Sequence, residues 1–402
     1  MTDVSSLAPM PLEGVRVLDL TQIYNGPYAT YLMAMAGAEV IKVEPPGGEY
    51  LRRRDAQAGA FVPFAMLNGC KKSISLNLKS EQGRELFLEM VKTADIVAEN
   101  YSPGVMDRLG LGYDTLRAIN PRIIMASGSG YGQDGGYSDL MAMDLTVQAM
   151  SGIMSITGYP DGPPTKSGAA VCDFMGGVHL YGAMMTALYA RERTGKGARI
   201  DVAMMDAVYP VMASSIGLLY GARKGAASRT GNRHGGLSLC PYNAYPASDG
   251  HVVIICNNDK HWHALLKSMG MSEMASDPRV LSMVDRVRNM DFVDDLVAGF
   301  TSKKTKQELT DIFRKNRVPS APVRELTEVM QDPVLHERGT LFDVDHPAYG
   351  KLTLANSAMR YGHTETPDYR CSPDFGEDNQ AVYREFGLDE AQLEALKKEG
   401  VI

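Results

Sequence analysis

The pattern of hydrophobic positions changes repeatedly along the first half of the chain. Short apolar runs, typical of buried strands, alternate with segments in which apolar residues recur every three or four positions, as on one face of a helix. Strands and helices that alternate in this way form a parallel sheet with helices on both faces. The sequence therefore predicts an α/β fold with a doubly wound parallel sheet. The expected strands are residues 15–20, 38–44, 73–78, 95–100, 122–127 and 199–205.

One predicted helix has an acidic residue at its start. Apolar residues recur at intervals of four and three after Asp173, and Gly195 is a typical stop signal. Asp173 stands just before the first apolar residue, where Asp is a preferred N-cap. We therefore expect Asp173 to cap this helix. The expected buried stripe is Phe174, Val178, Tyr181, Met185 and Leu188.

Two glycines in the first turn of this helix suggest a further role for Asp173. Gly176 and Gly177 each cost up to roughly 1 kcal/mol of helix stability relative to Ala, so something is expected to approach the backbone closely. A carboxylate at a helix N-terminus is stabilised as the anion, and a positioned, ionised Asp is a competent nucleophile. The same residue can be both cap and nucleophile.

Composition excludes several classes of function. The chain of 402 residues is 44% hydrophobic, and its formal charge of −7 gives no general basic field for nucleic acid. No apolar run reaches membrane-spanning length, and the N-terminus lacks a signal-peptide core. The five cysteines form no CxxC pair, which favours free thiols in a reducing cytoplasm over a disulfide or zinc framework. We expect a cytoplasmic protein without a metal site.

The second half of the chain has a different order of predicted elements. Residues 221–236 are rich in Gly, Ala, Ser, Arg and Lys, which predicts a domain boundary. A hairpin over residues 243–255 and several helices then indicate a small α+β unit. His261 and His263 are two residues apart on a predicted helix, so they diverge and make a poor metal pair. The expected later elements are helices 261–269, 290–300, 304–315 and 389–398 and strands 318–323 and 355–361.

Two further segments are candidates for ligand contacts. The turn 128–132 (GSGYG) follows a predicted strand at its carboxyl end, where open α/β sheets bind ligands. Lys71 and Lys72 precede another strand, and this basic pair fits a solvated loop as well as a phosphate contact. The first strand-to-helix turn lacks GxGxxG, which argues against a nucleotide-binding oxidoreductase.

Five motifs in order resemble the class III CoA-transferases, the CaiB/BaiF-like family that includes formyl-CoA transferase and carnitine CoA-transferase. They are PLEGVRVLDLTQIYNGPYATYLMAMAGAEVIKVE, NGCKKSISLNLKS, DIVAENYSPGVMDRLGLGYDTL, NPRIIMASGSGYGQDG and DGPPTKSGAAVCDFMGGVHLYGAMMTALYARERTGKG. The resemblance implies a large Rossmann-like domain from residues 1–222 together with the returning segment 331–402, a small domain from residues 223–330, and an interlocked homodimer.

The resemblance also implies a reaction. Asp173 falls on the catalytic aspartate of the family, which moves CoA from an acyl-CoA to a carboxylic acid through an aspartyl mixed anhydride and an aspartyl-CoA thioester. Coenzyme A and its thioesters are then substrates, with no tightly bound cofactor. The positions implied to contact CoA or the intermediates are Gln22, Tyr24, Lys71, Lys72, Asn100, Tyr101, Arg108, Tyr131, Gly235 and Gly236.

Three positions depart from the formyl-CoA transferase pattern. Tyr24 replaces a glutamine, although Gln22 stands two residues earlier, Pro45 replaces a basic residue, and Ser129 replaces a lysine. These departures weaken the expectation that formate or oxalate is the substrate. They also leave the phosphate contacts undefined.

Other functions were weighed against CoA transfer. An α-methylacyl-CoA racemase of the same superfamily needs a proton-transferring partner for the aspartate, and the position of its histidine is Met143 here. A CoA-binding scaffold without activity would not need Asp173 and its glycines intact.

Overall fold

The computed structural model describes residues 7–53, 61–220, 225, 228–362, 364–365 and 368–402. The chain packs as two compact units. The first unit contains residues 1–147, 169–208 and 333–402, and the second contains residues 148–168 and 209–332. The sequence placed the boundaries near residues 222 and 330. Packing also assigns residues 148–168 and 209–222 to the second unit.

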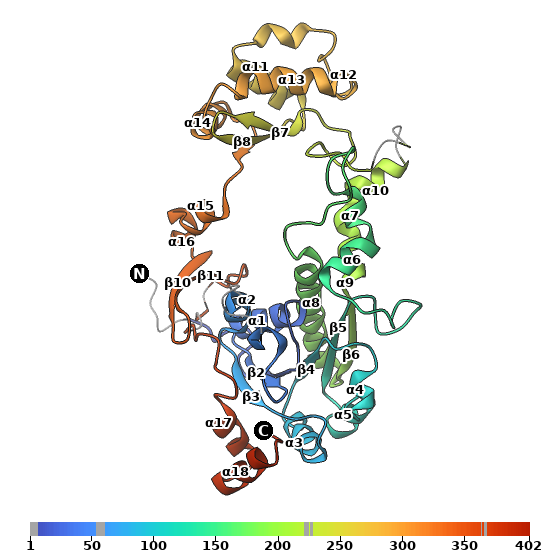
Figure 1. Cartoon of the computed structure of the whole chain (residues 1–402), viewed down its shortest axis with the longest axis vertical. Helices are drawn as coiled ribbons and strands as arrows, with labels where there is room; N and C mark the ends of the chain where they lie inside the picture. Colours follow the sequence, from blue (N-terminus) through green and yellow to red (C-terminus); the bar gives the residue numbers. More distant parts are fainter. Residues whose placement is uncertain (1–6, 54–60, 221–224, 226–227, 363, 366–367) are drawn as a thin grey trace. The chain divides into compact units, whose positions relative to one another are not determined.

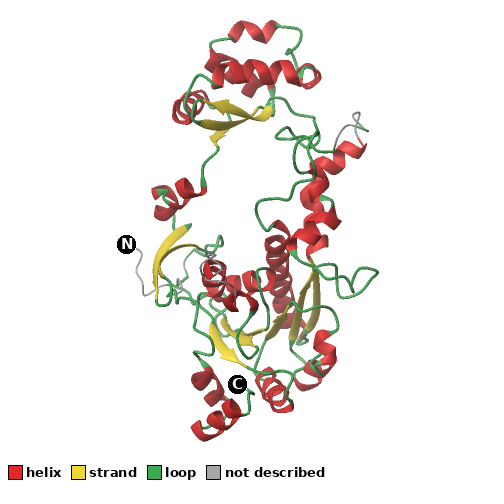
Figure 2. Ribbon diagram, viewed as in Figure 1, coloured by secondary structure: helices red, strands yellow, loops and turns green. Residues whose placement is uncertain are grey.

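A six-stranded parallel sheet forms the centre of the first unit (Figures 1 and 2). Its strand order is β3-β2-β1-β4-β5-β6, which confirms the predicted mixed α/β architecture with a parallel sheet. The chain order reverses between β1 and β4, so the loops after these two strands diverge and leave a crevice at their carboxyl ends. The strands are β1 (Arg16–Asp19), β2 (Glu39–Glu44), β3 (Lys72–Ser75), β4 (Ile96–Glu99), β5 (Ile124–Ser129) and β6 (Ala198–Ala203).

Each face of this sheet has its own hydrophobic core. On one face, α1 (Asn25–Met35) and α8 (Val171–Thr194) pack against buried residues such as Val17, Ala98 and Ala126. On the other face, the core includes Phe87, Leu116 and Tyr383, which come from three further helices. These helices are α3 (Glu81–Val91), α5 (Tyr113–Ile119) and α17 (Asn379–Glu385), and α18 (Glu390–Lys398) follows at the end of the chain.

The buried face of α8 agrees only in part with the stripe that the sequence predicted. Leu188 is buried, and Tyr181 and Met185 pack against the core as expected. Leu180 and Met184 are fully buried, whereas Val178 is 44% exposed. The packed face begins with two glycines, which carry no hydrophobic signal. A Cβ atom on Gly176 would lie 2.2 Å from the side-chain nitrogen of Asn25, and one on Gly177 would lie 2.6 Å from the Asn25 carbonyl oxygen. The glycines therefore allow α1 to approach closely, so the close approach expected at this turn is made by another helix of the fold.

Shorter elements complete the first unit. The predicted strand 355–361 is wrong, because the strand there ends at Ala355 and belongs to a hairpin that the sequence analysis missed. No helix in the described part of the chain is long and apolar enough to cross a membrane. The remaining elements are α2 (Phe61–Asn68), α4 (Val105–Arg108), α9 (Met204–Val208), α16 (Pro333–Glu337), β10 (Leu341–His346), β11 (Gly350–Ala355) and the 3₁₀ helix Tyr50–Arg53. Helix α6 (Asp144–Ser151) begins in the first unit and ends in the second.

The second unit contains a three-stranded sheet with the order β7-β8-β9. Its core surrounds Trp262, Val293 and Phe313. A 3₁₀ turn that contains Pro210 precedes α10, since proline has no N–H to donate to a continuous α-helix. The elements are α7 (Ile153–Ile156), α10 (Ala213–Tyr220), β7 (Tyr242–Ala247), β8 (Gly250–Ile255), α11 (Asp259–Met269), α12 (Met283–Arg288), α13 (Met290–Thr301), α14 (Lys306–Asn316), β9 (Ser320–Pro322) and α15 (Leu326–Met330), with 3₁₀ turns at Tyr209–Met212 and Ser272–Ser276.

We predict opposite effects for two Gly→Ala substitutions in α8. Gly177→Ala should destabilise the protein by about 2 kcal/mol, since the new methyl group meets backbone that cannot move aside easily. Gly182→Ala is the matched control, because nothing lies within 4 Å of its Cβ position, and it should stabilise by up to about 1 kcal/mol through helix propensity. Urea denaturation measures both changes. Equal effects of the two substitutions would contradict the close packing of α1 on α8.

Candidate active site

A cavity of about 400 Å³ opens at the carboxyl ends of β1, β4 and β5. Three loops that follow these strands line it, and Asp173 at the start of α8 completes the lining. The predicted site residues that line this cavity are Gln22, Asn100, Tyr101, Tyr131 and Asp173. The structure therefore brings together residues that are up to 151 positions apart in the sequence, from 22 to 173.

Asp173 does not cap α8, so the predicted N-cap is wrong. The N-cap position is Ala170, which has no capping side chain, and Asp173 lies in the first helical turn. The capping acceptor is Asp144 at the start of α6. Its Oδ1 accepts hydrogen bonds from the backbone N–H groups of Cys172, at 2.8 Å, and of Asp173, at 3.2 Å. Because a distant carboxylate satisfies these amides, the Asp173 side chain is available to face the cavity.

The carboxyl group of Asp173 is an unusually basic one. Burial first and the nearby Asp144 carboxylate second raise its pKa to about 7. The helix N-terminus acts in the opposite direction, because its partial positive charge favours an anion. Perturbed titratable groups in a cavity are typical of functional sites, and a more basic carboxylate is also a stronger nucleophile. The sequence analysis missed Asp144, whose only signal is its position at a predicted helix start.

The loop after β1 is held in a strained shape at the edge of the cavity. Asn100 forms a pair of hydrogen bonds of 2.8 Å with the backbone N–H and carbonyl of Gln22. The next residue, Ile23, has a φ of 68°, a left-handed conformation that a β-branched residue rarely adopts. Its N–H donates to Glu49 at 3.1 Å. Asn100 thus connects the loop after β4 to the loop after β1. These are the two strands between which the strand order reverses.

Lys71 has a structural role and is not placed to bind CoA. Its side chain is fully buried, and its ammonium group contacts Asp19 at 3.0 Å and oxygens of Pro27, Thr30 and Asn68 at 2.8 to 3.1 Å. An ammonium group has three N–H donors, so these partners leave none for a phosphate. Burial raises the pKa of Asp19, but the ammonium groups of Lys71 and a second lysine outweigh burial and lower it.

Three other predicted contacts also lie outside the lining of this cavity. Lys72 is partly buried and pairs with Glu39 at 2.5 Å. Arg108 is exposed on α4. The ring of Tyr24 stacks on that of Phe174, with centroids 6.1 Å apart. Tyr24 therefore packs beside the residue that follows Asp173, without lining the cavity in this structure.

The two predicted loop glycines belong to the second unit. Gly236 lines a separate cavity of about 520 Å³ together with residues of α10 and α12. Gly235 stands close to α10, since a Cβ atom on it would lie 2.8 Å from the hydroxyl of Ser215. The sequence placed these glycines near the intermediate on resemblance alone.

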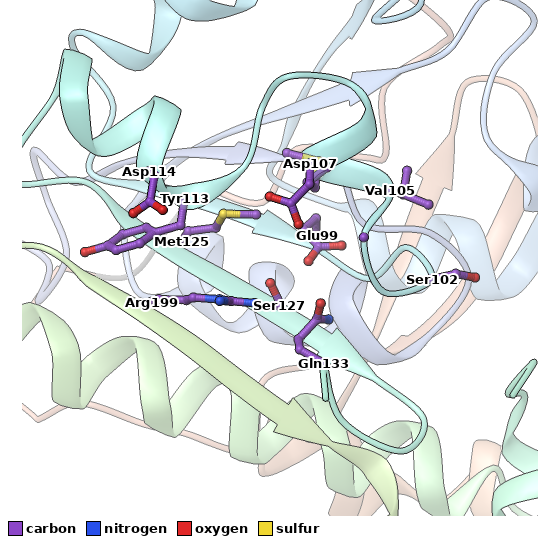
Figure 3. Close-up of a pocket in the computed structure, with 12 residues that line it drawn as sticks. Glu99, Ser102, Val105, Asp107, Tyr113, Asp114, Met125, Ser127, Gln133 and Arg199 are labelled. Carbon is purple, nitrogen blue, oxygen red and sulfur yellow. The ribbon is translucent and has the colours of Figure 1, made fainter. Parts of the chain in front are cut away.

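A second, smaller cavity of about 70 Å³ lies on the other face of the sheet (Figure 3). On β5, Ser127 faces this cavity, whereas the adjacent Gly128 faces the larger one, as the alternation of a strand requires. Glu99 is 3% exposed here, and burial raises its pKa to about 7. Its carboxylate accepts the backbone N–H of Tyr101 at 2.8 Å and so shapes the loop that lines the larger cavity. Sequence reasoning missed Glu99, which stood inside an apolar strand.

Among the described residues, no group of three or more His, Cys, Asp or Glu side chains is placed to hold a metal ion. The chemistry of the larger cavity therefore has to be considered from its own side chains. Its lining offers one carboxylate, Asp173, surrounded by amides, hydroxyls and apolar groups. Such a site can bind an uncharged or weakly polar group beside a carboxylate of raised basicity.

A parallel sheet with a reversed strand order, and a cavity with one carboxylate at the switch point, are typical of a ligand-binding α/β protein. Comparison with known proteins narrows this class: residues 12–379 match the CoA-transferase family III, and the chain belongs to that family. It is an enzyme of the family III CoA-transferase class.

Three individual proteins illustrate how close these similarities are. The acetyl-CoA:oxalate CoA-transferase of Acetobacter aceti is 39% identical over 396 residues, which cover 98% of this chain and all (100%) of that protein. The succinyl-CoA:mesaconate CoA-transferase of Haloarcula marismortui is 36% identical over 94% of this chain and 97% of its own. The crystal structure of a CaiB/BaiF family protein from Brucella suis matches with a TM-score of 0.81 and 32% identity, over 94% of this chain and 100% of that one.

The raised pKa of Asp173 predicts a stability penalty that depends on pH. The unfolded chain ionises this carboxyl near its ordinary pKa of 3.8, whereas the folded chain does so near 7. Stability is therefore lost as the pH rises through this interval and stays low above it. Asp173→Asn should raise the unfolding free energy by on the order of 2 kcal/mol at pH 8, with a gain that shrinks towards pH 4.

Denaturant unfolding at several pH values measures this difference. Asp206→Asn is the control, because it makes the same change of side chain at an exposed position of the next helix, α9. A gain for Asp173→Asn that is the same at pH 5 and pH 8 would contradict the raised pKa.

Proposed function

We propose that this enzyme transfers CoA from an acyl-CoA thioester to a carboxylic acid, with Asp173 as the nucleophile that carries both the acyl group and CoA. The observation that carries the proposal is the placement of Asp173: its carboxyl group lines the cavity at the switch point while Asp144 takes over the capping of α8. Membership of the family supports the same reaction class.

The first half of the reaction loads CoA onto the enzyme. A carboxylate oxygen of Asp173 attacks the thioester carbonyl carbon, the C–S bond breaks, and CoA leaves as the thiolate, which gives an acyl-aspartyl anhydride. The thiolate then attacks the aspartyl carbonyl carbon. The donor acid leaves as its carboxylate, and Asp173 becomes an aspartyl-CoA thioester. No proton is gained or lost, and the energy of the thioester is retained in the covalent intermediates.

The second half repeats these steps with the acceptor acid. The acceptor carboxylate attacks the aspartyl-CoA carbonyl carbon and expels the thiolate, which forms a second anhydride. The thiolate attacks the acceptor acyl carbonyl, so that acceptor acyl-CoA leaves and Asp173 is released as a carboxylate. The raised basicity of Asp173 favours its attack, and its buried setting limits access of water to the anhydride.

Small carboxylic acids are the substrate class that we propose. The relatives named above act, by their names, on oxalate and mesaconate, with acetyl-CoA or succinyl-CoA as donor. The three departures at Tyr24, Pro45 and Ser129 distinguish this chain from the formyl-CoA transferase pattern. Met143, which holds the position of the racemase histidine, lines the cavity, and its thioether cannot transfer a proton in α-methylacyl-CoA racemisation.

A homodimer is the assembly that we propose, on the resemblance to interlocked family members. Apolar side chains exposed on α8 of the isolated chain support it, among them Val178 at 44% and Tyr189 at 67%. Partner contacts of this kind would cover such residues.

The test of the nucleophile is Asp173→Ala. The variant should lose transfer activity by at least about a thousandfold while CoA still binds, since the substitution removes the attacking oxygen and leaves the other lining residues in place. Transfer is measured with acetyl-CoA and succinyl-CoA against a panel of small acids, with the mass of the product thioester as readout. Hydroxylamine added during turnover of the wild type should convert Asp173 to a hydroxamate. Full activity of the variant would end the proposal.

The assembly has its own test. Sedimentation equilibrium at micromolar concentration should give twice the chain mass of 43.8 kDa. Val178→Asp places a charge on the exposed face of α8 and should weaken the dimer without unfolding the chain, because the residue does not contribute to the described buried core. A wild-type monomer with full activity would refute the dimer.

A further inference from the structure

Glu99 connects the smaller cavity to a loop that lines the larger one. It is the last residue of β4, its side chain is 3% exposed, and it faces the smaller cavity. Its carboxylate accepts the backbone N–H of Tyr101 at 2.8 Å and a hydrogen bond from Ser127 on β5. Because Tyr101 lines the larger cavity, a group on one face of the sheet helps to fix a wall of the site on the other.

The smaller cavity has a second polar group that needs a partner. The Nε2 atom of Gln133 is buried and has no hydrogen-bond partner among the described residues. Figure 3 shows the side chains of Glu99, Ser127 and Gln133 pointing toward one another. The cavity of about 70 Å³ has room for several water molecules, since each needs roughly 10–15 Å³. Water in this space pairs with Gln133 and gives Glu99 a partner for proton exchange.

The surroundings of Glu99 make its protonation sensitive to pH near neutrality. Burial is the largest effect and raises its pKa, whereas hydrogen bonds from Ser127 and Tyr101 lower it, and the result is about 7. Several groups that line the cavity are exposed, so protons can reach Glu99 from solvent. The charged and titratable groups around Glu99 are Arg199 and Asp201 of β6, Asp107 of α4, Tyr113 and Asp114 of α5, and Tyr101.

Protonation changes what Glu99 can do for the loop. Hydrogen bonds to an ionised acceptor are roughly twice as strong as those to a neutral one. A protonated Glu99 offers only a neutral acceptor to the N–H of Tyr101, and its own hydroxyl group then needs an acceptor. The loop is therefore held firmly when Glu99 is ionised and weakly when it is protonated.

We propose that Glu99 is a positioning residue that couples CoA affinity to pH: its carboxylate holds the Tyr101 loop in the shape that binds CoA, and its protonation loosens that loop. The inference rests on the proposed function, because it takes CoA as the ligand of the larger cavity. Glu99 acts through the backbone of Tyr101 and does not contact the ligand. By linkage, CoA binding favours the ionised form and promotes release of its proton.

The experiment measures the Kd for CoA by isothermal titration at pH 5.5 and pH 8. Both proteins carry Asp173→Asn, which removes the other cavity carboxyl group that titrates near neutral pH, and one also carries Glu99→Gln. Gln accepts the N–H of Tyr101 as a protonated acid does, but it cannot ionise. The added substitution should raise the Kd about fivefold at pH 8 and leave it nearly unchanged at pH 5.5. The phosphate of CoA titrates alike with both proteins, so its effect cancels in the ratio of Kd values.

The matched control is Asp114→Asn in the same background. It removes an exposed acid from the lining of the smaller cavity and should not change the Kd at either pH. A ratio of Kd values for Glu99→Gln that is the same at both pH values is the result of a purely structural role, and it overturns the inference.

Hydrogen–deuterium exchange tests the inference without a variant at Glu99. In the wild type, the peptide that contains Tyr101 should be better protected at pH 8 than at pH 5.5, after correction for the intrinsic exchange rate. Equal protection overturns the inference and leaves the proposed function intact. The proposed function itself fails if CoA binds to none of these proteins or if transfer survives in Asp173→Ala.

Discussion

The approach of α1 to the first turns of α8 is the contact on which the site depends. Gly176 and Gly177 remove the side chains that would separate the two helices, and Asn25 occupies the space that they leave. Both helices begin at the carboxyl edge of the sheet, so the contact sets the height of Asp173 relative to the loops after β1 and β4. The loss of helix propensity at two glycines, roughly 1 kcal/mol each, is the energetic cost of this arrangement.

The loops around the cavity are held by interactions that point away from it. Lys71 neutralises Asp19 at the end of β1, and Asn100 ties the loop after β4 to Gln22. Glu99 holds the same loop from the other face of the sheet. Because these groups bind one another, the cavity is left with few charges beyond Asp173. A site with fixed walls and one basic carboxylate suits covalent catalysis. In such catalysis, the positioning of the reacting groups and the exclusion of water matter more than the strength of the electric field at the site.

The sequence predicted the sheet well because strand and helix periods differ and six alternating segments are hard to mistake. The prediction was wrong where the structure depends on features other than the pattern of hydrophobic residues. The packed face of α8 begins with glycines, so Val178 was wrongly included in a stripe whose later members do pack on the core. Asp173 appeared to be a cap because local sequence cannot reveal that Asp144 accepts the same amides from 29 residues away. For Lys71 the sequence left a solvated loop and a phosphate contact equally open, since a lysine before a strand gives no sign of a buried partner such as Asp19.

The separation of capping from catalysis explains why two acids stand at one helix start. A carboxylate that accepted the first amides of α8 would be held by hydrogen bonds that stabilise its anion, so its pKa would be low and its nucleophilicity poor. Asp144 accepts those bonds instead, and its charge opposes ionisation of Asp173. Asp144 thus supports the helix and at the same time raises the basicity of its neighbour. The arrangement destabilises the folded chain above neutral pH, because the buried Asp173 carboxylate is then charged beside a second acid.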